Sequence, residues 1–467
     1  MRASDAFAWY MERDPALRST AVGICWLDRA PRWDKFVDRI DRMSRQMVSL
    51  RQRVVESPFR LATPRWTNDD HFDLNWHLRR VNAPEPRTRD AVLELARLAA
   101  MDTFDRARPL WESTLVEGMK GGKAAVVFKF HHSLSDGVGW MQMMGVLFDL
   151  ERDPGDLGPM PSAPMGETLG RRALITGALT SMVGRVAHRA RRGVEAAGPT
   201  LLHTAHRPLG TVREAAAMAA SVYRFAAPIS DTLSPVMRER AMVRHLALME
   251  IPVADLKRAA KSVDVTLNDA FLGAVTGGLR RYHERHGTTV ESLRITMPIN
   301  IRTERDTGVW GNRITLRRVT LPVSEPDPVI RMRMVHGVVE SAREEPSNPI
   351  TDTLAEGLNL LPVAYIGGML KHIDFLASNV PGSPVPIYLA GARVTGMVAF
   401  GPTIGASFNI TLISHVDICN MGINIDTSAV PDPDVLLECL REGFAEITAL
   451  GGEMLSTTSH DLTAGST

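Results

Sequence analysis

The chain has 467 residues, 44% of them hydrophobic, which is enough apolar material for two or three domains with sizeable cores. Its 54 basic and 53 acidic residues leave a net charge of +1, so the composition gives no indication of nucleic acid as a partner. The three cysteines are Cys25, Cys419 and Cys439, and their odd number and wide spacing argue against a disulfide framework or a zinc site.

The N-terminus lacks the pattern of a signal peptide, because Asp5 stands where an apolar run would be required. No uncharged apolar stretch reaches the roughly 20 residues of a membrane-spanning helix. The longest candidate, residues 358–370, contains two adjacent glycines and is interpreted as a buried helix or lid segment. We therefore expect a cytoplasmic protein, either free or bound peripherally to the inner membrane or to lipid droplets.

The first half, residues 1–155, alternates strand and helix patterns. Residues 20–27 predict a β-strand, and residues 32–48 predict a helix in which apolar side chains recur at helical spacing. A cluster rich in proline and glycine at residues 153–164 then marks a loop or domain edge.

Residues 131–137 read His-His-Ser-Leu-Ser-Asp-Gly and follow the β-prone residues 124–130. Because strand side chains alternate between two faces, His132 is predicted to share the apolar face, and His131 the opposite face with Lys129. An imidazole in apolar surroundings beside a reaction path can act as a general base, since its pKa lies close to working pH. His132 is therefore the first candidate for a catalytic residue.

The same residues also have a structural interpretation. A histidine on the apolar face of a strand is often a core residue whose polar atoms are satisfied by hydrogen bonds. Asp136 and Gly137 could simply form the turn before a helix that starts near Val138. Residues 131–137 alone do not decide between the two interpretations.

A basic connector, residues 156–241, separates the two halves. Its alanine-rich part, residues 169–225, has helical propensity and carries nine arginines against only Glu195 and Glu214. These arginines are Arg171, Arg172, Arg185, Arg189, Arg191, Arg192, Arg207, Arg213 and Arg224. The connector is either a basic surface for an anionic membrane or lipid droplet, or a crossover helix pair with solvated arginines.

The second half, residues 242–452, again mixes strands and helices and is followed by a flexible tail at 453–467. We expect strands at residues 244–249, 393–400, 406–414 and 417–425, and a helix at 267–286. Mixed elements repeated in two halves indicate a pair of α/β sandwiches.

The His-His-x-x-x-Asp-Gly pattern resembles the active-site motif of the CoA-dependent acyltransferase superfamily, which includes chloramphenicol acetyltransferases and condensation domains. Further segments resemble one branch, the bacterial wax ester synthase/diacylglycerol acyltransferase family, and span the chain from residue 4 to about residue 447. In chain order these are Pro109-Leu110-Trp111, Asn268-Asp269, residues 297–302, residues 311–313 and residues 378–382. Ser383 departs from the family pattern, where proline is usual.

This resemblance implies a fold of two chloramphenicol-acetyltransferase-like α/β domains, mixed sheets flanked by helices, with the active site in a tunnel at their interface. It implies acyl-CoA as co-substrate, without a permanently bound cofactor, and a hydrophobic alcohol as acceptor. No metal is expected, because no third ligand joins the near pairs His71 with His77 and His283 with His286 at a recognisable spacing.

The resemblance also assigns roles within the motif. His132 would be the general base and His131 a supporting residue. Asp136 would shape the loop by pairing with an arginine, for which Arg302 is the first candidate and Arg313 the second. Gly137, which has no Cβ atom, would permit a tight turn or the close approach of a ligand.

The other matching segments have both functional and structural interpretations. Thr266 and Asp269 resemble a capping box at the start of the helix at 267–286, which leaves the Asn268 amide available for substrate. Ser378 and Asn379 could contact substrate or belong to a plain turn ending at Gly382, where the turn would use the conformational freedom of glycine. Pro109, Leu110 and Trp111 would support the fold or line the acyl path.

These observations predict an O-acyltransferase that moves a long-chain acyl group from acyl-CoA to diacylglycerol, giving triacylglycerol, or to a fatty alcohol, giving a wax ester. No Gly-x-Ser-x-Gly nucleophile motif is present, which favours direct transfer without an acyl-enzyme. The alternatives are a condensation-type transferase with another acceptor or a carrier-protein donor, and a non-catalytic protein of lipid droplets.

Overall fold

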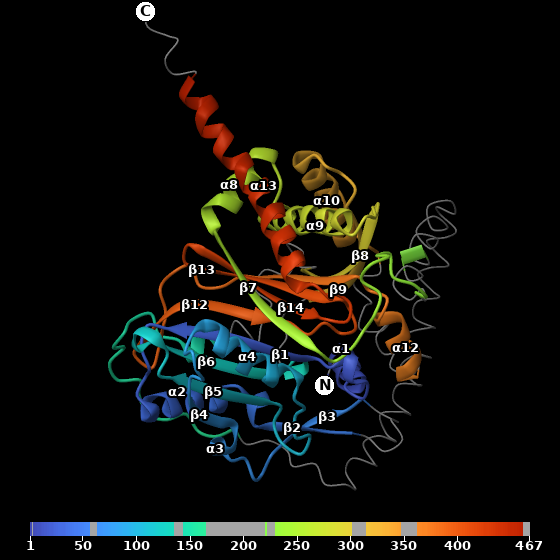
Figure 1. Ribbon diagram of the computed structural model, residues 1–467. Coiled ribbons are helices and arrows are strands. Elements are labelled where there is room, and N and C mark those ends of the chain that lie inside the picture. Colours follow the sequence, from blue (N-terminus) through green and yellow to red (C-terminus); the bar gives the residue numbers. More distant parts are fainter. Residues whose placement is uncertain are drawn as a thin grey trace, which may run out of the picture.

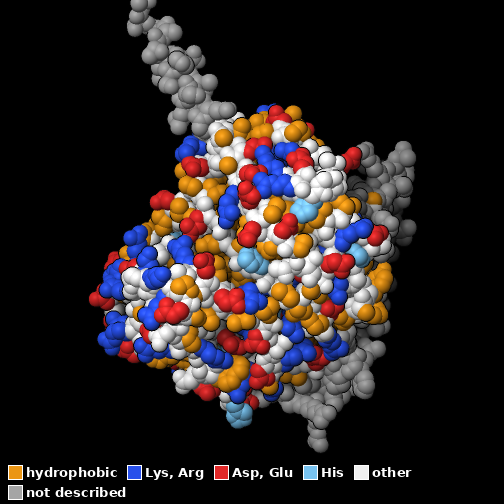
Figure 2. Space-filling model, in the orientation of Figure 1, with side chains coloured by type: hydrophobic (Ala, Val, Ile, Leu, Met, Phe, Trp, Pro, Cys, Tyr) orange, Lys and Arg blue, Asp and Glu red, His pale blue; other side chains and the backbone are white. Residues whose placement is uncertain are grey.

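The computed structural model describes residues 1, 3–56, 63–134, 143–164, 220–221, 229–300, 314–346 and 362–460. Two six-stranded sheets with flanking helices dominate this part of the chain (Figure 1), which confirms the predicted mixed α/β fold. On the face shown in Figure 2, basic and acidic side chains are interspersed, as expected for a net charge near zero. None of the described helices is long and apolar enough to cross a bilayer.

The first sheet has the strand order β11-β12-β1-β6-β5-β4. Its strands are β1 (Thr20–Leu27), β4 (Leu78–Asn82), β5 (Trp111–Glu117), β6 (Ala124–His131), β11 (Tyr388–Leu389) and β12 (Ala392–Phe400). The accompanying helices are α1 (Ala3–Met11), α2 (Trp33–Gln46), α3 (Leu74–His77) and α4 (Arg89–Met101), and a separate hairpin comprises β2 (Gln52–Val55) and β3 (Arg65–Asn68).

Alternation along β1 explains why helices cover both faces of this sheet. Cys25 and Leu27 belong to the same core cluster as Phe36 of α2. Ile24 packs on the opposite side, in the cluster that contains Val92 of α4. A strand covered on both faces is apolar throughout, and every residue of β1 is buried.

The second sheet has the strand order β7-β14-β13-β10-β8-β9. Its strands are β7 (Arg244–Pro252), β8 (Ser292–Asn300), β9 (Ile314–Pro322), β10 (Phe375–Val380), β13 (Phe408–His415) and β14 (Ile418–Asp426). The helices of this half are α8 (Val253–Val263), α9 (Leu267–Arg285), α10 (Pro328–Arg343), α12 (Val363–Leu370) and α13 (Pro433–His460). Four of these helices, α8, α9, α10 and α13, contribute to the core that covers this sheet (Figure 1).

The predicted elements at residues 20–27, 32–48 and 267–286 are confirmed as β1, α2 and α9. Two local predictions are wrong. Ser378–Gly382 is not one turn, since β10 runs on through Val380 and pairs in parallel with β13. Strand alternation also does not extend to His132, because β6 ends at His131 and a short 3-10 turn follows.

The two halves of the sequence share the first sheet. β12 follows β10 in the chain, yet it pairs antiparallel with β1, with Val22 opposite Phe400. β12 also lies close to β14 of the second sheet, because a Cβ atom added at Gly422 would collide with the carbonyl oxygen of Ala399. Hydrogen bonds within one sheet and packing against the other therefore both hold β12 in place.

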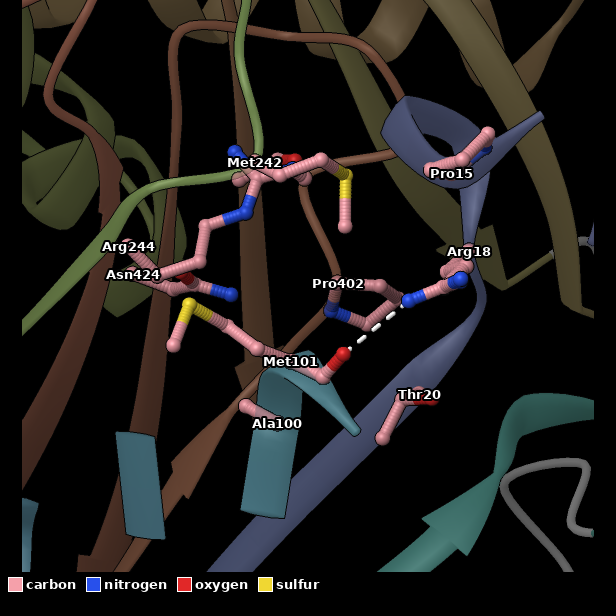
Figure 3. Close-up of a pocket in the computed structure, with 10 residues that line it drawn as sticks. Pro15, Arg18, Thr20, Ala100, Met101, Met242, Arg244, Pro402 and Asn424 are labelled. Atoms are coloured by element: carbon pink, nitrogen blue, oxygen red, sulfur yellow. Dashed lines mark hydrogen bonds between the residues drawn. The ribbon is translucent and has the colours of Figure 1, made fainter. Parts of the chain in front are cut away.

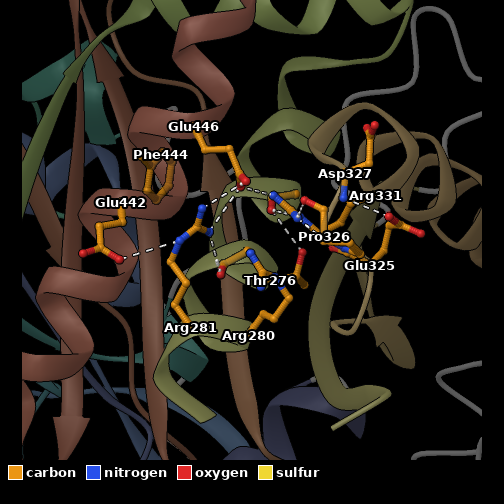
Figure 4. A network of polar contacts seen from close by, with 12 residues as sticks. Thr276, Arg280, Arg281, Glu325, Pro326, Asp327, Arg331, Glu442, Phe444 and Glu446 are labelled. Carbon is orange, nitrogen blue, oxygen red and sulfur yellow. Dashed lines mark hydrogen bonds and ion pairs between the residues drawn. The ribbon is translucent and has the colours of Figure 1, made fainter. Parts of the chain in front are cut away.

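A buried charge network ties the helices of the second half together (Figure 4). The Arg331 side chain is fully buried, and its Nε donates to the Gly273 carbonyl oxygen at 3.0 Å. Its Nη2 pairs with Glu446, which also binds Arg281 Nη2 at 3.0 Å. Because breaking a buried ion pair leaves an uncompensated charge, this network holds α9, α10 and α13 in one arrangement.

Gly422→Ala should destabilise the protein by about 3 kcal/mol or more, since the added methyl forces β14 away from β12. Gly337→Ala is the matched control, because nothing lies within 4 Å of its Cβ position on α10. The control should gain about 0.5–1 kcal/mol from its better helix propensity. Equilibrium denaturant unfolding measures both changes, and equal stability of the two variants would contradict the close contact.

Candidate active site

The predicted His-His motif sits in a turn that is anchored on both sides. His131 ends β6, and its backbone N–H donates to the Leu110 carbonyl oxygen at 3.0 Å. The His132 N–H donates to the Ser19 carbonyl oxygen at 2.8 Å. The turn is therefore held by the segment before β5 on one side and by the residue before β1 on the other.

Contacts at both ring nitrogens hold the His131 side chain in one orientation. Its side chain is 1% exposed, and Nδ1 lies 3.1 Å from the Ser133 backbone N–H and 2.7 Å from the Ser133 hydroxyl. A backbone N–H can only donate, so Nδ1 accepts and the ring proton belongs on Nε2. Nε2 lies 3.1 Å from Oε1 of Glu12, so the carboxylate faces the ring N–H at ion-pair distance.

Glu12 connects both histidines to the start of β1. Its Oε1 accepts the Ser19 N–H at 2.5 Å, and the Ser19 carbonyl in turn binds the His132 N–H. Burial raises the pKa of Glu12, but hydrogen bonds from His131 and Ser19 outweigh it and lower the pKa below its ordinary value. Glu12 is far from the motif in the sequence and resembles any acidic residue after a helix, so no local pattern identifies it.

The surroundings of His131 are aromatic. Its ring makes edge contacts with Trp9 and Phe104, at centroid distances of 6.0 and 6.2 Å. The Lys129 ammonium lies 4.5 Å from the centre of the same Phe104 ring. These contacts restrict ring rotation and add to the lock formed by Glu12 and Ser133.

His132 differs from its neighbour. Its side chain is accessible to solvent, although protein encloses it closely enough for desolvation to lower its pKa. The adjacent His131 lowers the pKa further, and a hydrogen bond with its own backbone opposes these effects. A pKa below the ordinary value keeps the imidazole neutral near pH 7, which is the form that accepts a proton.

The segment Pro109-Leu110-Trp111 is buried and forms a support for the turn. Trp111 Nε1 donates to the Leu50 carbonyl oxygen at 2.8 Å, and its ring stacks on His77 at a centroid distance of 4.5 Å. Burial lowers the pKa of His77 to about 4, so that ring is neutral in its stack. Leu110 contributes the carbonyl oxygen that receives the His131 N–H.

Asp269 forms the predicted capping box with Thr266 at the start of α9. Its Oδ2 also lies 2.8 Å from Nδ1 of His336 on α10, which sequence analysis did not anticipate. Asn268 is half-buried beside it. Among the contacts of the described residues, none joins Asn268 to either histidine of the motif.

Ser378 and Asn379 are half-buried on β10, and the described contacts do not bring them to the His-His turn. The role predicted for Gly382 is corrected. Its backbone does not have a positive φ angle, and it must be glycine because a Cβ atom would collide with the Ser414 carbonyl oxygen. Close approach of two backbones, rather than turn conformation, therefore explains this residue.

Asp136, Gly137 and the two arginine candidates, Arg302 and Arg313, lie outside the described residues, as does most of the basic connector. Within the described ranges, no three His, Cys, Asp or Glu side chains are grouped as metal ligands. The described chemistry of the site therefore consists of one accessible imidazole, one locked imidazole and one ionised carboxylate.

Comparisons with known proteins relate this site to one family. The model of the wax ester synthase/diacylglycerol acyltransferase catalytic domain matches residues 1–271, and the model of that family's C-terminal domain matches residues 310–448. A putative diacylglycerol O-acyltransferase of Mycobacterium tuberculosis is 35% identical over 448 residues, covering 94% of this chain and 90% of that protein. A probable diacylglycerol O-acyltransferase of the same species is 26% identical over 434 residues, covering 90% and 89%.

Solved structures share the fold. The wax ester synthase/diacylglycerol acyltransferase from Marinobacter aquaeolei VT8 superposes with a TM-score of 0.62 at 21% identity, covering 96% of this chain and 98% of that one. The first condensation domain of the calcium-dependent antibiotic synthetase gives 0.61 at 14% identity, covering 97% and 95%. These likenesses confirm the predicted two-domain, chloramphenicol-acetyltransferase-like architecture.

Glu12→Ala should destabilise the protein by about 2–3 kcal/mol, because it leaves the Ser19 N–H without its acceptor and removes the carboxylate 3.1 Å from the buried His131 Nε2. Since the folded pKa of Glu12 is below its ordinary 4.5, this contribution is complete above that pH and disappears as pH falls through the folded pKa. Urea unfolding at pH 7 and at pH 3.5 measures the loss.

Glu56→Ala is the control, since Glu56 also contacts α1 by accepting a hydrogen bond from Trp9 Nε1. Its ion pairs, unlike the contacts of Glu12, are with partly exposed arginines. It should cost no more than about 1 kcal/mol. An equal loss in both variants would contradict the special position of Glu12.

Proposed function

Because the chain belongs to the wax ester synthase/diacylglycerol acyltransferase family and is an acyl-CoA-dependent acyltransferase of that type, we propose that its acceptor is diacylglycerol and its product triacylglycerol, with fatty alcohols as alternative acceptors. The names of its relatives in Mycobacterium tuberculosis support this acceptor. The observation that carries the mechanism is the contrast between a locked His131 and an accessible His132.

His132 acts as the general base. Desolvation and the adjacent His131 lower its pKa, so its imidazole is neutral at working pH. In this scheme the ring proton is on Nδ1, and the Nε2 lone pair is left for the acceptor hydroxyl. Glu12 and His131 do not touch the substrate in this scheme; they position the turn that carries His132.

The reaction proceeds by direct transfer. The acceptor hydroxyl gives its proton to Nε2 of His132 while its oxygen forms a bond to the thioester carbonyl carbon. The tetrahedral intermediate then breaks its carbon–sulfur bond, and the carbonyl re-forms as an ester. The CoA thiolate leaves and takes the proton from His132, which restores the neutral imidazole. The reaction therefore needs no acyl-enzyme.

Purified protein supplied with palmitoyl-CoA should release CoA when dioleoylglycerol is present, and more slowly when hexadecanol replaces it. Thiol release and product chromatography follow the two reactions. Omission of the acceptor is the control, and release should then stop because water is not the intended nucleophile. A rate with hexadecanol well above that with dioleoylglycerol would overturn the proposed acceptor.

His132→Asn should lower kcat by roughly 10²- to 10⁴-fold, the usual contribution of a general base, while the unfolding midpoint stays near that of the parent protein. His71→Asn is the matched control, because His71 is an exposed histidine of the same half, and it should keep full activity. An active His132→Asn protein would remove His132 from the mechanism.

The acid limb of the kcat/KM profile should have its midpoint below pH 6.5, since burial lowers the pKa of His132 from that ordinary value. Activity is present while the imidazole is neutral and is lost as pH falls through this pKa. Initial rates from pH 4.5 to 9 measure the midpoint. A midpoint at or above 6.5 would show that desolvation does not control the base.

A further inference from the structure

A polar pocket lies where the two halves meet, beside the start of β1 (Figure 3). Arg18 and Thr20 line it from the first half, and Arg244, Thr403 and Asn424 line it from the second. Thr20 stands directly opposite His131 in the β1–β6 register, so the pocket adjoins the catalytic turn. None of these five pocket side chains has a role in the acyl-transfer mechanism.

The pocket walls carry several buried polar atoms without a hydrogen-bond partner in the described structure. These are Arg18 Nε, Thr20 Oγ1, Thr403 Oγ1 and Asn424 Oδ1. Thr20, Thr403 and Asn424 are each no more than 4% exposed, and Arg244 is 9% exposed. Buried polar groups are nearly always satisfied in folded proteins, so these three unsatisfied donors, with the Asn424 Oδ1 acceptor beside them, indicate a ligand site.

The charges around the pocket favour an anion. Arg18 and Arg244 line it directly, and Arg240 is close enough to interact with Asp426. Among the described residues that line the pocket, none is Asp or Glu. Behind this lining, Asp426 Oδ2 is 3.1 Å from Arg244 Nη1, and Arg240 interacts with Asp374 and Glu239 as well as with Asp426. The two cations that line the pocket therefore share its wall with the hydroxyl groups of Thr20 and Thr403.

Both guanidinium groups are held in place. Arg18 Nη1 donates to the Met101 carbonyl oxygen at 3.0 Å, the bond drawn in Figure 3, while Asp426 fixes Arg244. The amide nitrogen of Asn424 donates to the Gly401 carbonyl oxygen at 2.9 Å, which fixes the orientation of that side chain. Preorganised arginines with planar donor sets suit the oxygens of a phosphate group.

We propose that Arg18 and Arg244 bind one phosphate group in this pocket, with Thr20 and Thr403 as hydroxyl donors. The group is supplied either by CoA or by free inorganic phosphate. Bound there, it joins the first half to the second beside the residues that anchor the His132 turn. The CoA source rests on the family's use of acyl-CoA, whereas the site itself does not depend on the proposed role of His132.

The test measures binding without turnover. The full chain is unfolded thermally in chloride buffer and in inorganic phosphate of equal ionic strength, and phosphate should raise the unfolding midpoint of the parent protein. Arg18→Gln and Arg244→Gln should each weaken phosphate binding at least about 10-fold in calorimetric titration. Arg89→Gln is the matched control, since Arg89 also bridges the halves, through Glu250, but does not line the pocket.

Thr403→Val distinguishes the loss of phosphate binding from the loss of folding that an arginine substitution could cause. It replaces a buried hydroxyl that has no partner by a methyl group of similar size, so it should keep the parent stability in chloride and still reduce the phosphate effect. An unchanged midpoint of the parent protein in phosphate would overturn the proposal. So would equal phosphate binding by the parent, Arg18→Gln and Arg244→Gln proteins.

Competition separates the two sources. If CoA and adenosine 3′,5′-bisphosphate displace inorganic phosphate from the parent protein, the pocket serves the donor substrate. If neither displaces it, the pocket binds free phosphate. Both results support the site, and neither requires active enzyme, so an inactive acceptor assay would leave this conclusion standing.

Discussion

The pairing of β12 with β1 is the constraint on which the rest of the structure depends. β1 is the central link, because β6, which carries the His-His turn, pairs with its other edge. β12 arrives from the second half of the chain and also packs against β14 at Gly422. The position of the His-His turn relative to the second half is therefore set through two adjacent strand pairings.

The two neighbouring histidines of the site differ: the His131 ring is held in place, whereas the His132 ring is accessible to solvent. Glu12, Ser133 and two aromatic rings fix His131, and the same carboxylate reaches the backbone of His132 through Ser19. His132 thus has a fixed backbone and an accessible ring. A general base needs both properties, because proton transfer requires a defined geometry and contact with the substrate.

Arginine side chains are buried in two places, among the helices of the second half and at the interface between the halves, and they differ in how many of their hydrogen bonds are formed. Arg331 is fully satisfied by carbonyl oxygens and Glu446, and it serves to hold helices together. At the interface between the halves, Asp426 pairs with Arg244, whereas Arg18 Nε has no hydrogen-bond partner in the described part of the chain. Unsatisfied buried donors cost stability, and this difference from the Arg331 network is the basis of the proposed phosphate site.

Local features of the structure follow from the sequence alone. The strand at residues 20–27, the capping box of Thr266 with Asp269 and the motif of residues 131–137 each depend on neighbours within a few positions, so their patterns could be recognised. Order and spacing of such short segments also sufficed to recognise the family and its chemistry.

Other features were decided only by tertiary structure, because they join residues far apart in the chain. Glu12 contacts His131 across more than a hundred positions, and Arg18 lines the same pocket as Arg244, more than two hundred positions away. Gly382 was noticed for turn freedom, but the approach of a distant carbonyl explains it. Periodicity and local propensity report on a residue's own segment, whereas burial, pKa shifts and close backbone contacts arise only when segments pack together.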